Sequence, residues 1–144
     1  MLNQEKVVAK VGDTLLDGTL LEEIKVSGGV AINFFKVVAF HGRTGGKNAV
    51  FTQHGLVAKE GDLLTDGTTL SKIYESAGVA INELAEVAFW GATGNTRAVY
   101  TQNEMVAKSG TELLNGNILE YINENGGVAI NFFGEVAFHG QTDG

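Results

Sequence analysis

Short apolar runs, separated by turns rich in Gly, Asn, Asp and Thr, recur along the chain, and this pattern predicts β-strands. A turn is expected at residues 91–95, and residues 70–74 alternate loosely enough to extend the first strand of their unit. Helices are disfavoured because Gly, Val and Thr return at short intervals. In the middle of the chain the predicted strands cover residues 78–82, 86–90, 98–102 and 105–108.

The same pattern returns at a constant offset of 49 residues. Val-Ala-Lys begins at positions 8, 57 and 106, and Gly-Val-Ala-Ile-Asn begins at positions 29, 78 and 127. Residues 8–56 and 57–105 are identical at 27 of 49 positions without a gap. Such gapless similarity indicates recent duplication or deliberate design, and it predicts three structural units.

Four short strands in a unit of this length fit one blade of a β-propeller, and three such units also fit a β-trefoil. The short spacing within units and the long links between them favour the propeller. Three blades are too few to close a ring, since propellers typically have about four to eight. We therefore expect an all-β fold with four-stranded blades, three per chain, and a six-bladed ring formed by a homodimer. The alternative is a β-trefoil monomer.

The ends of the chain indicate how such a ring would close. Residue 144 aligns with residue 46 and residue 1 with residue 50, so the array opens between the second and third strands of a unit. We expect a single repeat domain, residues 1–144, whose unit 110–144 is completed by strands from residues 1–11 of a partner chain. Pairing these strands would cover exposed strand edges and lock a C2 dimer. The two other units are residues 12–60 and 61–109.

Composition narrows the function classes. A chain of 144 residues, 44% of them hydrophobic, suits one globular domain. The absence of Cys excludes disulfides, thiolate metal sites and thiol nucleophiles, and the net charge of −7 argues against binding a nucleic-acid backbone. No apolar run reaches the roughly 18–20 residues of a membrane span, and we expect no signal peptide. No cofactor and no compartment are predicted.

The third unit carries Asn-Phe-Phe-Gly-Glu-Val-Ala-Phe at residues 131–138. This segment resembles the N-x-x-G-x-x-A-F signature of bacterial choice-of-anchor tandem-repeat proteins, and the likeness covers nearly the whole chain. The resemblance implies an extracellular β-propeller of unassigned activity. The signature Gly is Lys36 in the first unit and Ala85 in the second, and the chain has no Pro. These departures favour a recombinant, reconstructed or designed three-blade fragment.

The turn between the first two strands of each unit carries apolar residues where Asp, Asn or Gly are usual. A six-bladed ring would gather them at one end of its central channel, and an apolar patch on a protein surface usually marks a partner or ligand site. We expect a partner interface, with a plug of the channel and a small-ligand site as alternatives. The residues are Phe34, Phe35, Leu84, Phe132 and Phe133.

The end of the second strand carries His41, Trp90 and His139 in the three units, each followed by Gly. With Arg43 and Gln141 as hydrogen-bond donors, these residues suggest a shallow ligand rim suited to a sugar. The competing interpretation is that His and Trp cap the blade edges. No metal site is predicted, because three His are too few and the Gly-Asp links offer too few oxygens for Ca²⁺.

We therefore expect a non-catalytic, self-assembling scaffold or binding module whose partner is a second copy, with a face-to-face tetramer where the Phe pairs meet. A lectin-like carbohydrate-binding protein is the alternative. A hydrolase with a site across the dimer axis is a weaker alternative, because no nucleophile elbow or triad is present. Its carboxylates would come from Glu22, Glu23 and Glu120, which look like solvated surface.

Overall fold

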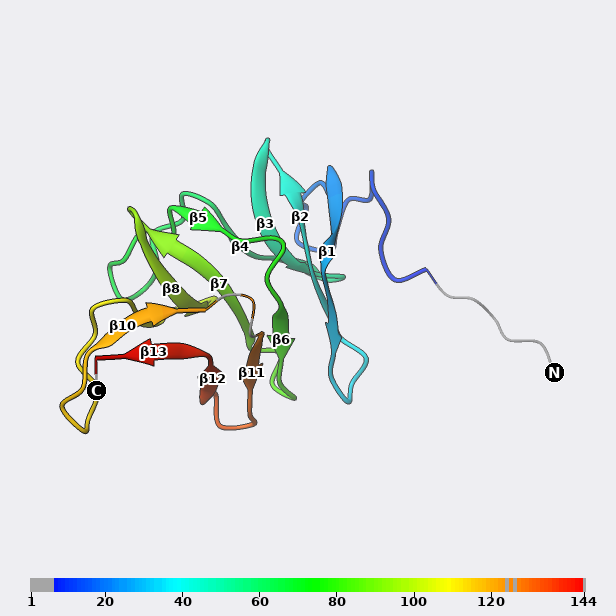
Figure 1. Ribbon diagram of the computed structural model, residues 1–144. Helices are drawn as coiled ribbons and strands as arrows, with labels where there is room; N and C mark the ends of the chain where they lie inside the picture. Colours follow the sequence, from blue (N-terminus) through cyan, green and yellow to red (C-terminus); the bar gives the residue numbers. More distant parts are fainter. Residues whose placement is uncertain (1–6, 124, 126, 144) are drawn as a thin grey trace.

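The computed structural model describes residues 7–123, 125 and 127–143, which form antiparallel β-sheets (Figure 1). None of the described residues lies in an α-helix, so this part of the chain holds no helix that could cross a membrane. The predicted all-β class is confirmed. Residues 1–6, which hold much of the strand pair expected in residues 1–11, lie outside the described part.

The first sheet is a four-stranded meander in which each strand pairs with the next along the chain. This order follows from the short turns between the predicted strands, and it confirms the strand order expected within a unit. A bulge interrupts the pairing of the first two strands between Lys25 and Val30. The strands are β1 (Glu23–Ile32), β2 (Val38–Thr44), β3 (Lys47–Thr52) and β4 (Gly55–Lys59).

The second sheet repeats this order, but its first strand is split into two pieces that both pair with β7. The shorter piece lies within residues 70–74, so the predicted extension of the first strand is confirmed. The strands are β5 (Lys72–Ile73), β6 (Val79–Ile81), β7 (Val87–Thr93), β8 (Thr96–Thr101) and β9 (Met105–Lys108).

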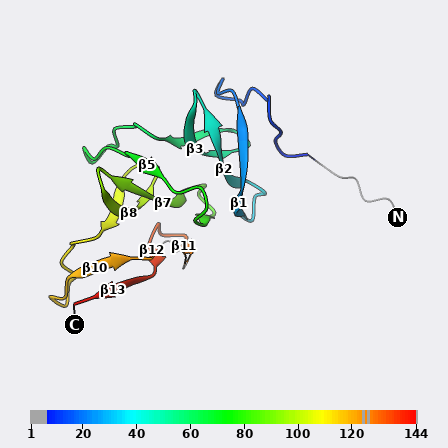
Figure 2. The same cartoon turned by 45° about the horizontal axis from the view of Figure 1, so that its top comes forward.

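In the last part of the chain, the described residues form only the first two strands of this pattern, each split into two pieces. Four strands result, and we call them together the third sheet. Figures 1 and 2 show the three sheets following one another in chain order, and β6 packs between β1 and β11. The pairs are β10 (Leu119–Ile122) with β13 (Gly140–Thr142) and β11 (Val128–Ile130) with β12 (Val136–Phe138).

The turn expected at residues 91–95 is shorter than predicted. β7 continues to Thr93 because Gly91 and Ala92 pair with β5, and only Gly94 and Asn95 form the turn. A Cβ atom at Gly91 would lie 2.4 Å from the carbonyl oxygen of Lys72. This glycine therefore allows two strands to approach closely, which a single sequence does not distinguish from a turn signal.

An apolar core joins the first sheet to the second. The first sheet contributes small side chains, including Ala39, Val50 and Ala58. The second sheet contributes large ones, including Phe89 and Tyr100, whose rings stack with centroids 5.7 Å apart. Small side chains on one sheet thus leave room for the aromatic rings of the next, which gives a close-packed interface.

A second core of the same kind joins the second sheet to the third. Trp90 and Val99 of the second sheet are buried against Leu119 and Ile122 of the third. The Trp90 ring meets the Phe138 ring edge to face, with centroids 6.3 Å apart. The second sheet therefore presents one face to the first sheet and its other face to the third sheet.

The turn that follows the first strand of each unit needs a positive φ: 64° at Lys36, 60° at Ala85 and 80° at Gly134. Side chains other than glycine are strained there because Cβ crowds the following carbonyl. We expect Ala85→Gly to raise the free energy of unfolding by about 1 kcal/mol and Gly134→Ala to lower it by about as much. Denaturant unfolding measures both changes, and a less stable Ala85→Gly protein would contradict the strain.

Candidate functional site

Three asparagines form a hydrogen-bonded ladder across the first strands of the three units. Asn33 Nδ2 donates to the carbonyl oxygen of Asn82 (3.0 Å), and Asn82 Nδ2 donates to the carbonyl oxygen of Asn131 (2.9 Å). Asn33 and Asn82 are buried, whereas Asn131 is exposed. The ladder thus runs in one direction through the sheets, and at its end Asn131 Nδ2 donates to the Glu135 carboxylate of its own turn (2.7 Å) and to no further unit among the described residues.

The same asparagines also hold their own turns. Asn82 Oδ1 accepts hydrogen bonds from the backbone N–H groups of Leu84 (3.0 Å) and Glu86 (2.9 Å), and Asn131 Oδ1 does the same for its turn. An amide side chain can accept with its oxygen and donate with its nitrogen at the same time. The sequence pattern predicts strand ends at these residues and does not by itself predict this second role. Their recurrence at residues 33, 82 and 131 is the signal that could have revealed it.

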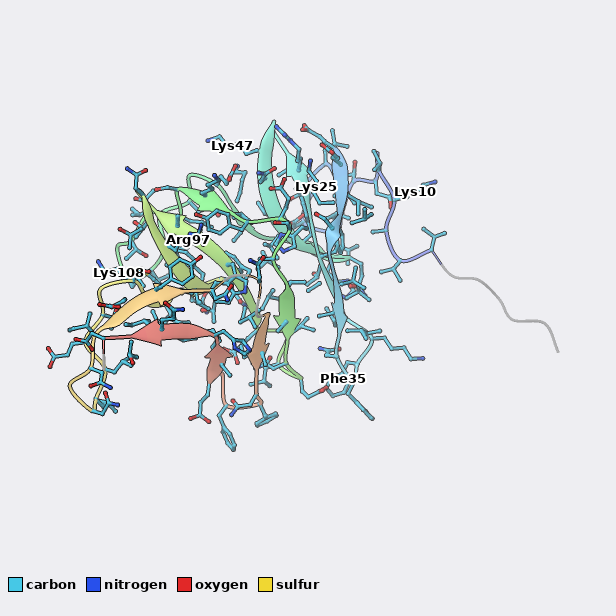
Figure 3. All side chains as sticks on the ribbon, viewed as in Figure 1. Lys10, Lys25, Phe35, Lys47, Arg97 and Lys108 are labelled. Atoms are coloured by element: carbon cyan, nitrogen blue, oxygen red, sulfur yellow. The ribbon has the colours of Figure 1, made fainter. Side chains whose placement is uncertain are left out.

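The turns held by the asparagines carry the five apolar residues predicted as a partner interface. We call these three turns together the aromatic tip. Their exposed fractions are 82% for Phe34, 67% for Phe35, 61% for Leu84, 54% for Phe132 and 83% for Phe133. The two Phe pairs pack edge to face, with centroids 5.5 and 5.6 Å apart. Figure 3 shows Phe35 at the end of the molecule, pointing away from the sheets. The tip fills no cavity within the described part of the chain.

The structure does not bring the predicted ligand rim together as one open surface. His41 is 0% exposed between the first and second sheets, and Trp90 is 1% exposed between the second and third. Only His139, at the same position of the third sheet, is exposed. The expectation of a shared rim is therefore corrected. The repeat position of His41, Trp90 and His139 faces the next sheet along the chain, so the side chain is buried wherever such a sheet is present.

Burial governs the chemistry of His41. Neither ring nitrogen has a hydrogen-bond partner of good geometry, and desolvation lowers the pKa of the imidazole below its usual value. The Glu75 carboxylate and the carbonyl groups of Ala77 and Gly78 oppose this shift without cancelling it. His41 is therefore held in its neutral form and does not serve as an exposed hydrogen-bonding group.

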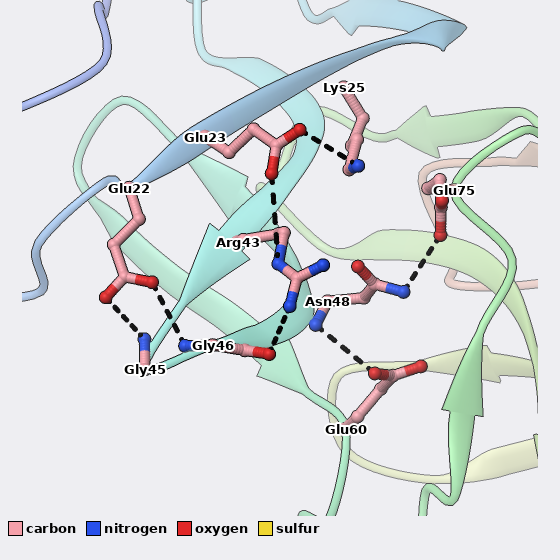
Figure 4. A network of polar contacts seen from close by, with 9 residues as sticks. All are labelled: Glu22, Glu23, Lys25, Arg43, Gly45, Gly46, Asn48, Glu60 and Glu75. Carbon is pink, nitrogen blue, oxygen red and sulfur yellow. Dashed lines mark hydrogen bonds and ion pairs between the residues drawn. The ribbon is translucent and has the colours of Figure 1, made fainter.

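The two predicted donors of the rim lie apart in the fold. Arg43 sits near the end of β2, with Nε 3.8 Å from the Glu23 carboxylate and Nη2 donating to the carbonyl oxygen of Gly46 (Figure 4). Gln141 lies in β13, where it is exposed and pairs with Tyr121. Arg43 therefore holds a turn of the first sheet, while Gln141 belongs to the third sheet.

The carboxylates considered for hydrolysis have structural partners. The two oxygens of Glu22 accept the backbone N–H groups of Gly45 and Gly46 at 3.0 Å each, which fixes the turn between β2 and β3 (Figure 4). Glu23 forms an ion pair with Lys25 at 3.0 Å. Among the described residues no group of three or more His, Cys, Asp or Glu could hold a metal ion. These contacts support a structural role for both carboxylates.

The outer face of the first sheet, which points away from the second sheet, is an apolar surface that no other sheet of the described chain covers. Phe40 and Phe51 stack there as Phe89 and Tyr100 do one unit later, with centroids 5.7 Å apart in both pairs. Val30, on the same face, is 68% exposed, whereas its counterpart Val79 is 9% exposed. A groove of about 250 Å³ crosses this face, lined by Val7, Val8, Ala9, Ile24, Val30, Val38 and Phe40.

The face of the third sheet that points away from the second sheet is also uncovered, although the equivalent faces of the first two sheets are covered. Ala39 and Ala88 are fully buried against the next sheet, but Ala137, at the same position, is exposed. His139 lies beside it, also exposed. The uncovered face of the third sheet therefore includes Ala137 and His139, whereas the uncovered face of the first sheet carries larger apolar side chains such as Phe40 and Val30.

Comparisons of the chain with models of protein families, with curated proteins and with solved structures found no match.

Proposed function

We propose that this chain is a non-catalytic, self-assembling repeat protein, in which two copies close one six-bladed β-propeller. Each sheet of the structure is then one blade. The first blade of each copy packs on the third blade of the other. Self-assembly through these contacts is the function that the geometry supports best. The likeness of residues 131–138 to choice-of-anchor repeats supports the same architecture.

The observation that carries this proposal is the difference in burial between equivalent residues. Val79 is 9% exposed inside the chain and Val30 is 68% exposed at one end, while Ala39 is buried inside and Ala137 is exposed at the other end. By their places in the repeat, the two uncovered faces correspond to the two sides of the interface that joins the first sheet to the second. A second copy would supply both missing halves, and a two-fold axis would close the ring without leaving an open face.

The segment of residues 7–9 supports the exchange of strands between copies. Ala9 packs against the outer face of the first sheet, as Ala58 packs in the first interface and Ala107 in the second. Ala58 and Ala107 both belong to the fourth strand of a sheet, β4 and β9. Ala9 thus lies where the fourth strand of a preceding blade would run, which is the place expected for residues 1–11 of one copy beside the third blade of the other.

Glutamine positions point to the same pairing. The side chain of Gln53 accepts from the backbone N–H of Val38, and that of Gln102 accepts from Val87, both at 2.8 Å. Val136 is the corresponding residue of the third unit, and by sequence Gln4 aligns with Gln53 and Gln102. Gln4 itself lies outside the described residues.

The alternatives have less support. A β-trefoil would join its hairpins in one barrel, whereas here each unit forms a sheet of its own. A lectin-like rim would keep only His139, Gln141 and the partly exposed Arg43, because His41 and Trp90 are buried. The ring requires none of these residues to bind a ligand.

Light scattering after size exclusion tests the ring. At low protein concentration we expect twice the chain mass of 15.2 kDa. Val30→Glu and Ala137→Glu change opposite ends of the chain, and each should give monomers because a charge would be buried at the same interface. Leu16→Glu, at an 84% exposed site outside the groove, is the matched control and should stay dimeric. A monomeric wild type, or a dimeric Val30→Glu protein, would overturn the proposal.

A further inference from the structure

The aromatic tip points to a second level of assembly. We propose that two propeller rings associate face to face through their tips, so that the partner of this surface is a second ring of the same chain. This inference rests on the proposed ring and goes beyond it, because ring closure uses the sheet faces and leaves the tip uncovered.

The area of the tip sets the order of assembly. A fully exposed Phe side chain presents roughly 200 Å², so with exposed fractions between 54% and 83% the four Phe rings of one chain present roughly 600 Å². A stable interface needs roughly 800 Å² from each partner. One chain falls short of this area, whereas a ring, with two tips, presents roughly 1,200 Å². Single chains are therefore not expected to associate by the tip, and rings are.

The carboxylates of the tip are hydrogen-bonded within the chain, which lowers the cost of removing water from them when two tips meet. Glu83 accepts from the backbone N–H of Phe34 at 2.9 Å. Glu86 and Glu135 accept from the amides of their turn asparagines, at 2.7 Å in both turns. These bonds satisfy oxygens that would otherwise need water, while the neutral donors leave the negative charge of each carboxylate in place.

The order of charges favours a second ring. The Phe-Phe turn of the first unit is followed by an exposed Lys36, and the Phe-Phe turn of the third unit is followed by an exposed Glu135, one position later. A two-fold axis through the second unit places first-unit turns opposite third-unit turns. Phe rings then meet Phe rings, and Lys36 approaches Glu135 of the opposite ring. An anionic lipid surface would instead meet three glutamates and one lysine in each tip.

Sedimentation of the full chain over a range of concentrations tests this inference. We expect the wild type to pass from two chains to four as concentration rises. Phe35→Ser with Phe133→Ser should weaken that step by roughly a hundredfold or more while two-chain rings persist. Leu114→Ser, at a fully exposed apolar site in the link between units, should leave the step unchanged. Val30→Glu should abolish both steps, since single chains lack the necessary area.

Each failure has a different meaning. A wild type that stays at two chains at every concentration would overturn the face-to-face contact and leave the ring intact. A wild type of one chain would overturn the proposed ring itself. Sedimentation with phosphatidylcholine vesicles that requires Phe35 and Phe133, from rings that never reach four chains, would overturn the second-ring partner and identify a membrane surface instead.

Discussion

Replacing Asn82 with alanine is expected to lower the free energy of unfolding by about 3 kcal/mol. The side chain accepts two backbone N–H groups in its own turn and donates to the carbonyl oxygen of Asn131 in the next unit. Each such bond is worth about 1 kcal/mol, and a buried group left without a partner costs about as much or more. At 4% exposure Asn82 is buried, so water replaces these bonds poorly.

Asn131→Ala is the matched comparison for this prediction. Asn131 holds its turn in the same way but is exposed and donates to no further unit among the described residues. Its loss should cost about 1 kcal/mol in a single chain. Denaturant unfolding of both variants in the Val30→Glu background excludes effects of assembly. Equal losses at the two positions would show that the ladder between units contributes nothing.

The strands could be predicted from the sequence because the apolar runs are short, regularly spaced and bounded by turn residues. The strand order within a unit followed from the short turns, and the structure confirms it for β1 to β4 and for β7 to β9. The repeat made this inference stronger, since one set of residues had to satisfy three units at once. The positive φ at Lys36 and Ala85 has a signal in the sequence as well, because the third unit carries Gly134 at the same position.

The burial of the second-strand residues could not be read from one sequence. His41, Trp90 and His139 have the same place in the repeat, yet the first two are buried and the third is exposed. The difference arises from the packing of one sheet on the next, which is a tertiary contact without a local signal. The double role of Asn82 was missed for the same reason, since its donor side bonds a residue 49 positions away.

The uncovered faces of the first and third sheets explain why equivalent repeat positions differ in burial. Residues of one type at one repeat position are buried inside the chain and exposed at its ends, as for Ala39 and Ala137. Repetition produces identical interfaces, and any open array of such units must leave one unmatched face at each end. The proposed ring removes both, so its energetic basis is the same packing that already joins the three sheets.

Acidification from pH 7 to pH 5 is expected to destabilise the single chain through His41. Burial lowers the pKa of this imidazole below 6.5, so the unfolded chain binds a proton more readily than the folded one. The free energy of unfolding is not reduced by His41 above about pH 6.5, and it decreases as the pH falls from there toward the folded-state pKa of this residue. The loss should approach about 1.4 kcal/mol for each pH unit. The carboxyl groups of Asp17 and Asp66, whose pKa values are also lowered, lose their contribution only below about pH 3.8.

His41→Leu should remove this dependence, because leucine fills a similar volume and carries no titratable group. His54→Gln, at an exposed histidine, should keep it. Unfolding in denaturant at pH 7, 6 and 5 measures the effect, again in the Val30→Glu background, where His139 stays exposed. A slope that survives His41→Leu would show that another group titrates. A slope that disappears with His41 would show that the contact between the first two sheets requires a neutral imidazole.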